Sequence, residues 1–151
     1  MKTKIQLFIS ALSILLITNF QINAETLQNS KNRDLPKFTS VKLAISANVY
    51  LTQSNKQSFR IEASDKLIKL IETKVENGRL TIKWSKWNVN HSEKIKIYIS
   101  MEKIEGVAIS GSGDIIADGT VKTDKIELAI SGSGDMSFSN LQANDIKSKI
   151  S

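Results

Sequence analysis

The 151-residue chain contains no cysteine, a single proline and a single histidine. Without cysteine there is no disulfide, no thiolate chemistry, no zinc–cysteine site and no lipid-anchored cysteine after a leader. The proline, Pro36, precedes the first apolar alternation, where it cannot damage a central strand. The histidine, His91, lies in a polar stretch, and an exposed loop residue explains it better than the base of a Ser–His pair.

Glycine is also scarce, and its seven occurrences match none of the glycine-rich signatures of catalysis. Gly-Ser-Gly at 111–113 and 132–134 lacks the Gly-x-Ser-x-Gly spacing of a nucleophile elbow. The same stretches lack the third glycine of a dinucleotide fingerprint and the lysine of a P-loop. We therefore interpret these glycines as turn residues and predict no cofactor.

Charge is absent from residues 5–17, an apolar run that follows Lys2 and Lys4 and precedes the small residue Ala24. This order predicts a cleavable secretory signal peptide over residues 1–24. The run is shorter than the roughly 20 residues that a membrane-spanning helix needs, so we expect no transmembrane segment after cleavage. The protein is then exported to the periplasm, the outer-membrane surface or the medium. An uncleaved N-terminal anchor is the alternative.

The chain after residue 24 is moderately basic, with 19 basic and 15 acidic residues. Its lysines are dispersed, which indicates a solvated surface and no nucleic-acid partner, with weak attraction to anionic glycans or lipids as the alternative. We expect residues 25–35 to be a linker. Residues 36–151 are long enough to bury a core without disulfides and are predicted to form one domain.

Alternating apolar residues dominate the chain from residue 41 onwards and predict strands with one buried face. The inward series are Val41, Leu43, Ile45, Ala47, Val49 and Leu51; Phe59, Ile61 and Ala63; Leu80, Ile82 and Trp84; and Ile95, Ile97 and Ile99. Mixed three-and-four spacing predicts one short helix of about two turns within 64–75. Asn77-Gly78 predicts a hairpin turn, and residues 85–94 a polar loop. The fold class is mainly β.

An eight-residue phrase occurs twice in the chain. AISGSGDI begins at Ala108, AISGSGDM begins at Ala129, 21 residues later, and residues 149–151 restate the start of a third copy. A β unit that repeats every 20 to 21 residues with a turn at a fixed place predicts a solenoid. Each unit is then one coil of a parallel stack about 4.8 Å apart, and neighbouring coils bury its apolar face.

The turn residues of the two copies match one to one. They are Gly111, Ser112, Gly113 and Asp114 in the first copy and Gly132, Ser133, Gly134 and Asp135 in the second. The glycines permit a sharp corner, and the serine and aspartate side chains are expected to satisfy exposed backbone amides. Beyond the turn one residue is deleted, and the alignment places Gly119 and Asn140 at a turn position suited to left-handed backbone.

Stacked Gly–Asp turns also raise calcium as a candidate ligand. Asp114 and Asp135 would lie near each other, as in nonapeptide-repeat proteins that bind calcium. Calcium takes six to eight oxygen ligands, and each turn supplies one aspartate, so carbonyls, serines and water would have to complete the site. Turn-capping aspartates are the preferred interpretation, and no metal site is predicted.

Residues 38–53, 67–84 and 95–115 resemble the head GIN domain of auto-transporter adhesins, a family common in exported Bacteroidota proteins. The most specific marks are the hairpin VENGRLTI and the repeated SGSGD, and the resemblance covers about residues 36–151. It implies a right-handed β-helix-like fold, an extracytoplasmic location and no catalytic residues.

Two departures from this family bear on the interpretation. Family members often carry more repeats after the second SGSGD, so we expect this chain to be part of a longer protein or to pair through an open coil edge after Ser151. The early stretch ISANVY, residues 45–50, occupies the place of an SGSGD-like turn but lacks both glycines.

We expect an exported, non-enzymatic adhesion or surface-interaction module with a cell-surface glycan or protein as its partner. Trp87, beside the polar loop, is the candidate ligand contact, whereas Trp84 continues an inward series. One alternative is a glycan-processing β-helix enzyme with Asp114 and Asp135 as its carboxyl pair. The other is a structural envelope protein that assembles through its open coil edge. Convergent acids in a deep groove would favour the enzyme, and a lysine-rich face with exposed aromatics would favour binding.

Overall fold

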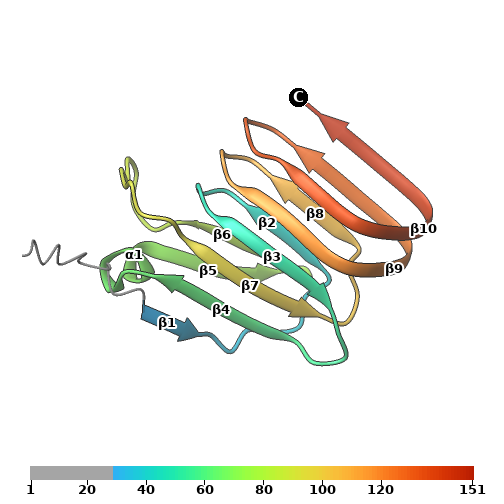
Figure 1. The fold of residues 1–151 in the computed structure, drawn as a ribbon, viewed down its shortest axis with the longest axis horizontal. Coiled ribbons are helices and arrows are strands. Elements are labelled where there is room, and N and C mark those ends of the chain that lie inside the picture. The colour runs from blue at the N-terminus through green and yellow to red at the C-terminus, as the bar shows by residue number, and fades with distance from the viewer. Residues whose placement is uncertain (1–28) are drawn as a thin grey trace, which may run out of the picture.

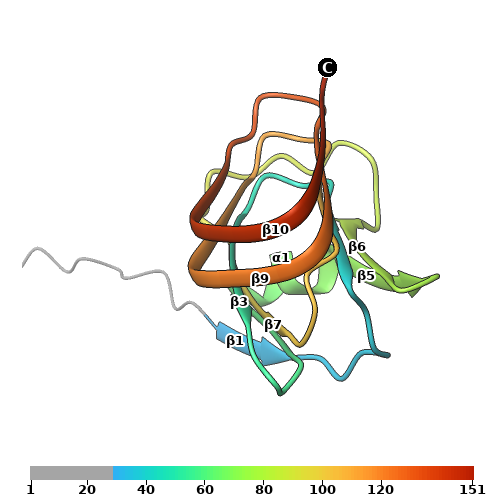
Figure 2. The same cartoon turned by 90° about the vertical axis from the view of Figure 1, so that its right-hand side faces the viewer.

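The computed structural model describes residues 29–151, so the signal peptide expected at 1–24 lies outside the described residues. The described part is mainly β, with ten strands in one open, strongly curled sheet and one short helix (Figures 1 and 2). The elements are β1 (Asn29–Asn32), β2 (Ser40–Leu43), β3 (Asn48–Gln53), β4 (Ser58–Ala63), α1 (Asp65–Leu70), β5 (Ile71–Glu76), β6 (Arg79–Trp84), β7 (Lys96–Met101), β8 (Gly106–Ile109), β9 (Asp114–Ile130) and β10 (Met136–Ile150).

The spatial order of the strands differs from their order in the chain. The sheet runs β1-β4-β7-β3-β9-β8-β2-β6-β5, and β10 pairs with β9. The pairs β1–β4, β4–β7 and β5–β6 are antiparallel, and the other pairs are parallel. β2 therefore lies between β6 and β8, and β3 lies between β7 and β9, although all four of these neighbours come later in the chain.

The predicted alternation is confirmed, because the inward series form a single buried core. Side chains with no exposed surface include Leu43, Val49, Ile61, Leu80, Ile82, Ile97 and Ile115. Burial of an aliphatic side chain of this size stabilises the fold by about 1.5–3 kcal/mol. No polar or charged residue among residues 29–151 is buried, so apolar packing alone fills the space that the sheet encloses.

Two aromatic expectations at the edge of this core need correction. Trp84 is only partly buried and packs against the core from its rim. His91 is half-buried, not exposed, because its ring packs edge-on against Trp84 with 5.3 Å between ring centroids. The Nδ1 atom of His91 also lies 2.9 Å from the carbonyl oxygen of Glu93. The histidine thus braces the loop between β6 and β7.

The predicted short helix is confirmed as α1, which ends at Leu70, and residues 71–76 form β5. The β-branched residues Thr73 and Val75 suit a strand, and β5 pairs antiparallel with β6 across a tight turn. That hairpin turn was predicted correctly: Asn77 has φ 49° and Gly78 has φ 73°. The hairpin therefore includes residues 71–75, the rest of the stretch in which the two-turn helix was expected.

Residues 29–32 lie within the segment expected to be a linker, yet they form β1. This strand pairs antiparallel with β4, with Asn29 opposite Ala63. Its sequence, Asn-Ser-Lys-Asn, carries no apolar alternation and its side chains are exposed. Backbone hydrogen bonds at a sheet edge hold it, which is why no side-chain pattern predicted it.

The alignment of the two sequence copies is confirmed by the strand register. β10 lies parallel to β9, with Met136 beside Ile115 and Leu141 beside Val121. The deletion falls at a bulge between Phe138 and Asn140. The paired residues are therefore 21 apart before the bulge and 20 apart after it.

The expectation of left-handed backbone at Asn140 is wrong. Asn140 pairs with Thr120 in a regular register, and the only non-glycine residues of the described chain with positive φ are Asn77 and Asn88. Gly119, with φ 88°, is the extra residue of the longer copy. Only β9, the strand that carries the extra residue, needs an unusual backbone conformation at this bulge.

Candidate functional site

The two SGSGD stretches form corners, one between β8 and β9 and the other between β9 and β10, and these corners stack directly on one another. A Cβ atom at Gly134 would lie 2.1 Å from the carbonyl oxygen of Gly113. A Cβ atom at Gly113 would in turn lie 2.5 Å from the carbonyl oxygen of Ile45. Real Cβ atoms do not approach backbone so closely, so both positions need glycine for packing. The repeated motif is thereby explained by close backbone contact.

The stretch ISANVY, residues 45–50, forms the matching corner below these two without glycine. Its flanks are held by the Ala44 amide, which donates to the Ile82 carbonyl, and by the Asn48 amide, which donates to the Ile95 carbonyl. Between Ile82 and Ile95 the chain leaves the sheet as the loop that joins β6 and β7. No further corner of the described chain is therefore stacked against the side of residues 45–50 that faces away from the SGSGD corners. Residues with side chains fit there in place of glycine.

Asp114 caps the corner above it and thus has a structural role. The backbone N–H of Asp135 donates to Asp114 Oδ1 at 3.0 Å, which brings the two aspartates together as predicted. Ser112, the other expected cap, makes no such bond within the described chain. Across residues 29–151 no three His, Cys, Asp or Glu side chains gather to hold a metal. The side chains of Asp114 and Asp135 alone therefore cannot supply the six to eight oxygen ligands that calcium takes.

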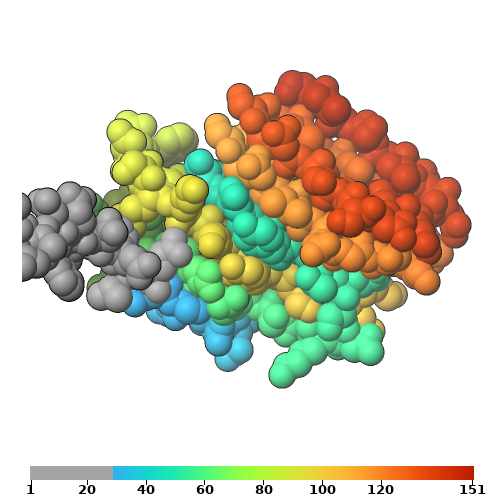
Figure 3. Space-filling model, viewed as in Figure 1, coloured from blue at the N-terminus to red at the C-terminus, as the bar shows by residue number. Residues whose placement is uncertain are grey.

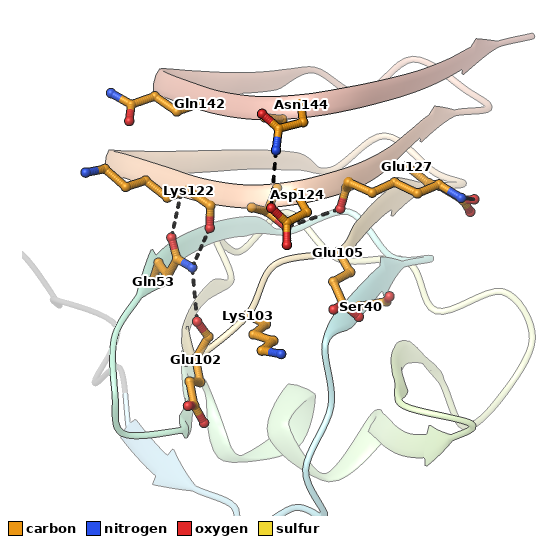
Figure 4. A pocket seen from close by; sticks show the side chains of 13 residues that line it. Ser40, Gln53, Glu102, Lys103, Glu105, Lys122, Asp124, Glu127, Gln142 and Asn144 are labelled. Carbon is orange, nitrogen blue, oxygen red and sulfur yellow. Dashed lines mark hydrogen bonds and ion pairs between the residues drawn. The ribbon is translucent and has the colours of Figure 1, made fainter.

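A polar groove of about 1050 Å³ lies at the other bend of the repeated units, beside the curves of β9 and β10 (Figure 4). Its residues are Ser40, Gln53, Glu102, Lys103, Glu105, Lys122, Thr123, Asp124, Lys125, Glu127, Gln142, Ala143 and Asn144. Gln53 closes one side: its Nε2 donates to the Glu102 and Lys122 carbonyls at 3.0 and 2.9 Å, and its Oε1 accepts from the Lys122 amide at 2.7 Å. One side chain thus ties β3 to the segment before β8 and to the bend of β9.

The charges in this groove are mixed and partly paired. Lys125 Nζ lies 3.7 Å from Glu127 Oε1, and Asn144 Nδ2 donates to Asp124 Oδ1 at 3.3 Å. Figure 4 shows acids and lysines alternating along its wall. Four carboxylates line the groove, and of these Glu127 is paired with a lysine and Asp124 accepts from an amide.

An aromatic stack covers the outer face of β3, β7 and β4. The rings of Tyr50 and Tyr98 stack with centroids 5.2 Å apart, and the Arg60 guanidinium lies 4.2 Å from the centre of the Tyr98 ring. Glu62 pairs with Arg60 and accepts a hydrogen bond from the Tyr98 hydroxyl at 3.1 Å. Desolvation, followed by this hydrogen bond, raises the pKa of Tyr98 above its ordinary value. Both faces of the Tyr98 ring are occupied, so the stack stabilises the sheet and offers no free platform.

A second depression, of about 1080 Å³, lies between α1 and the loop that joins β6 and β7. Trp87 is 97% exposed there, although tryptophan is normally highly buried. Lys66 and Lys69 of α1 and Lys86 of the loop line the same depression, and Glu93 is the one acid that lines it. In Figure 3 the yellow-green residues of this loop project beyond the body of the sheet. We call Trp87 with these three lysines the Trp87 face.

Arg33 holds α1 in place beneath this face. Its guanidinium donates to the carbonyls of Ile68 and Ile71 at 3.0 and 2.8 Å and to Thr73 Oγ1 at 3.0 Å. These bonds satisfy carbonyls at the end of the helix, which otherwise lack partners. Burial lowers the pKa of Arg33 from its ordinary value. The sequence offered no signal for this residue, because it precedes the patterned part of the chain.

Comparison with known proteins places the chain in a family. Residues 37–151 match the family model described as "Putative auto-transporter adhesin, head GIN domain", and the chain belongs to this family. No protein with a curated description matches it significantly.

Solved structures share the fold at low sequence identity. A crystal structure described as a putative adhesin from Bacteroides fragilis has a TM-score of 0.77 and 22% identity. The match covers 83% of this chain and 59% of the chain in that structure. One described as a putative lipid binding protein from Parabacteroides distasonis has a TM-score of 0.67 and 17% identity, covering 83% and 63%. A putative adhesin from Parabacteroides merdae has a TM-score of 0.65 and 16% identity, covering 82% and 59%. The chain thus spans about three-fifths of these structures.

Proposed function

We propose that this protein is an exported, non-enzymatic adhesion or surface-interaction module that makes contact through its Trp87 face. The carrying observation is Trp87 itself, which stands almost fully exposed beside Lys66, Lys69 and Lys86. Exposing an indole to water gives up the favourable burial of a large apolar ring, and tryptophan is enriched at interfaces, where its ring is buried and its N–H finds a partner. The adhesin name of the family supports an attachment role and a cell-surface or exported location.

A non-enzymatic role fits the chemistry of the two depressions. The groove beside β9 and β10 mixes carboxylates with lysines, of which Glu127 and Lys125 are paired, and the depression at the Trp87 face is lined by one carboxylate, that of Glu93. A glycosidase needs two carboxyl groups at controlled separation on either side of its substrate. Asp114, one of the two carboxylates considered for that role, is engaged by a backbone amide.

The 20–21-residue units support a finer proposal about architecture. We propose that they are coils of a right-handed parallel β-helix-like solenoid, with the SGSGD corners on one side and the bends of β9 and β10 on the other. The parallel register of β8 with β9 and of β9 with β10 supports this proposal. A structural envelope protein that assembles through β10 is the second candidate, favoured by the exposure of Ile146 and Ile150 (51% and 80%). Light scattering with and without calcium tests whether the protein assembles, and a stable monomer would rule out this second candidate.

Binding of the purified chain to intact cells and to arrays of glycans and surface proteins tests the proposed function. We expect Trp87→Ala to weaken binding by about tenfold or more, as for loss of an aromatic anchor. Ile150→Ser is the matched control, because Ile150 is also exposed but lies on β10. Equal binding by Trp87→Ala and the unchanged chain would refute the assignment of this face.

A further inference from the structure

We propose that the Trp87 face docks the protein on an anionic lipid bilayer. This inference rests on the proposed function, since it names the partner of the same surface. The three lysines Lys66, Lys69 and Lys86 form no ion pair within the described residues. Their charge is therefore available to a negatively charged partner. The surface thus combines unneutralised positive charge with one projecting indole ring.

The chemistry of this face fits a membrane interface better than a protein partner. Tryptophan partitions to the level of lipid headgroups, where its apolar ring is buried while its N–H stays hydrated. Lysine side chains lay their apolar stems along a surface and keep the ammonium among headgroups. Each lysine near an anionic bilayer contributes about 1 kcal/mol of attraction. Protein interfaces, in contrast, are depleted of lysine at their core.

The loop presents Trp87 from a braced base, so docking need not order a free segment. His91 packs on Trp84 and contacts the Glu93 carbonyl, which fixes the far side of the loop. Arg33 bonds to carbonyls at the end of α1 and thereby fixes the helix that carries Lys66 and Lys69. Preorganisation of this kind lowers the entropy lost on binding.

The Trp87 face lies at one end of the molecule (Figure 1), which decides what stays free when the face is occupied. β1 begins at the same end: Asn29 pairs with Ala63, and α1 starts two residues after Ala63. β10 lies at the opposite end of the long axis (Figure 1). Docking through the Trp87 face would leave β10 directed away from the bilayer.

Co-sedimentation with lipid vesicles tests this inference. The protein is the chain recovered after export, with its N-terminus established by mass spectrometry, and the probes are phosphatidylcholine vesicles with or without about one-third phosphatidylglycerol. We expect binding to the anionic vesicles only, weakening steeply as salt rises from about 50 to about 500 mM. Trp87→Ala should lower the partition coefficient by about tenfold.

Charge variants give the sharper comparison. The triple variant K66Q/K69Q/K86Q should bind anionic vesicles about 100-fold less tightly, at about fivefold per lysine. The double variant K147Q/K149Q is the matched control, because both lysines are exposed on β10. It should bind within about twofold of the unchanged chain, since charges beyond a Debye length of about 10 Å contribute little. Circular dichroism of each variant checks that the sheet is intact.

The outcomes separate this inference from the proposed function. Equal binding to neutral and anionic vesicles, or equal loss in the two lysine variants, would overturn docking of this face on an anionic bilayer. If Trp87→Ala loses binding to immobilised glycans or surface proteins while no form binds vesicles, the proposed function stands and the lipid partner is wrong. If Trp87→Ala changes neither kind of binding, both are wrong.

Discussion

At the scale of single residues, two glycines of one corner differ sharply in what surrounds them. A Cβ atom at Gly113 would lie 2.5 Å from the Ile45 carbonyl oxygen and 2.6 Å from that of Ala47. A Cβ atom at Gly111 would meet its nearest neighbour, the Ala44 carbonyl carbon, at an ordinary 3.6 Å. The corner thus contains its own control, two positions away and in the same turn.

We predict that Gly113→Ala lowers the free energy of unfolding by about 2–3 kcal/mol, because backbone must shift to admit the methyl group. Gly111→Ala should change it by less than about 1 kcal/mol, because the new methyl group makes normal contact and reduces the freedom of the unfolded chain. Urea unfolding of both variants measures the difference. Equal stability of the two would contradict the assignment of Gly113 to close backbone stacking.

The repeated SGSGD stretch predicted the position of the corners correctly but suggested ligand-binding roles for their aspartates that the hydrogen bonds do not support. The two SGSGD copies predicted a shared corner, and their glycines and Asp114 serve it. The same letters suggested calcium or paired catalytic carboxylates, because sequence shows which oxygens exist and not which backbone amides they accept from. Asp114 accepts from Asp135, a bond that depends on stacking and that no single-copy pattern reveals.

At the scale of elements, α1 depends on a side chain from outside the helix. The helix spans six residues, too few for intrinsic stability. Its N-cap, Ser64, makes no side-chain capping bond, so the Arg33 guanidinium at the other end is its main polar anchor. The placement of Lys66 and Lys69 on the Trp87 face follows from this anchor.

We therefore predict that Arg33→Lys destabilises α1 by about 1–3 kcal/mol, because an ammonium cannot reproduce the planar fork that reaches two carbonyls and a hydroxyl. Hydrogen exchange of the peptide covering residues 65–71 should accelerate correspondingly. Lys31→Ala is the control, since this exposed residue of β1 should leave the exchange of α1 unchanged. Unaltered exchange of α1 in the Arg33 variant would rule out the anchor.

Elements differ in how far their sequence predicted them. Strands with one buried face repeat every second residue, so β3, β6 and β7 were recognisable, and Asn77-Gly78 marked the β5–β6 turn. The end of α1 was not recognisable, because residues 71–75 satisfy helical spacing and strand pairing alike. Pairing with β6 decides between them, and that is a tertiary effect.

At the scale of the whole molecule, the strand order was beyond sequence reasoning. β2 pairs with β6 and β8, so residue 41 lies between residues 80 and 107. All three strands carry the same aliphatic pattern, which is compatible with several parallel orders. Among residues 29–151, no helix is long and apolar enough to cross a membrane. The Trp87 face at one end and β10 at the other give the molecule two chemically different ends (Figure 1).

The fluorescence of Trp87 tests most directly whether the Trp87 face makes contact with a cell surface. Because the chain has two tryptophans, Trp84→Phe leaves Trp87 as the sole fluorescent indole. We would measure its emission maximum and its quenching by acrylamide, free and with intact cells. We expect the emission to shift to shorter wavelength and the indole to be protected from quenching when the protein binds. Binding that leaves Trp87 as exposed as in the free protein would contradict the claim.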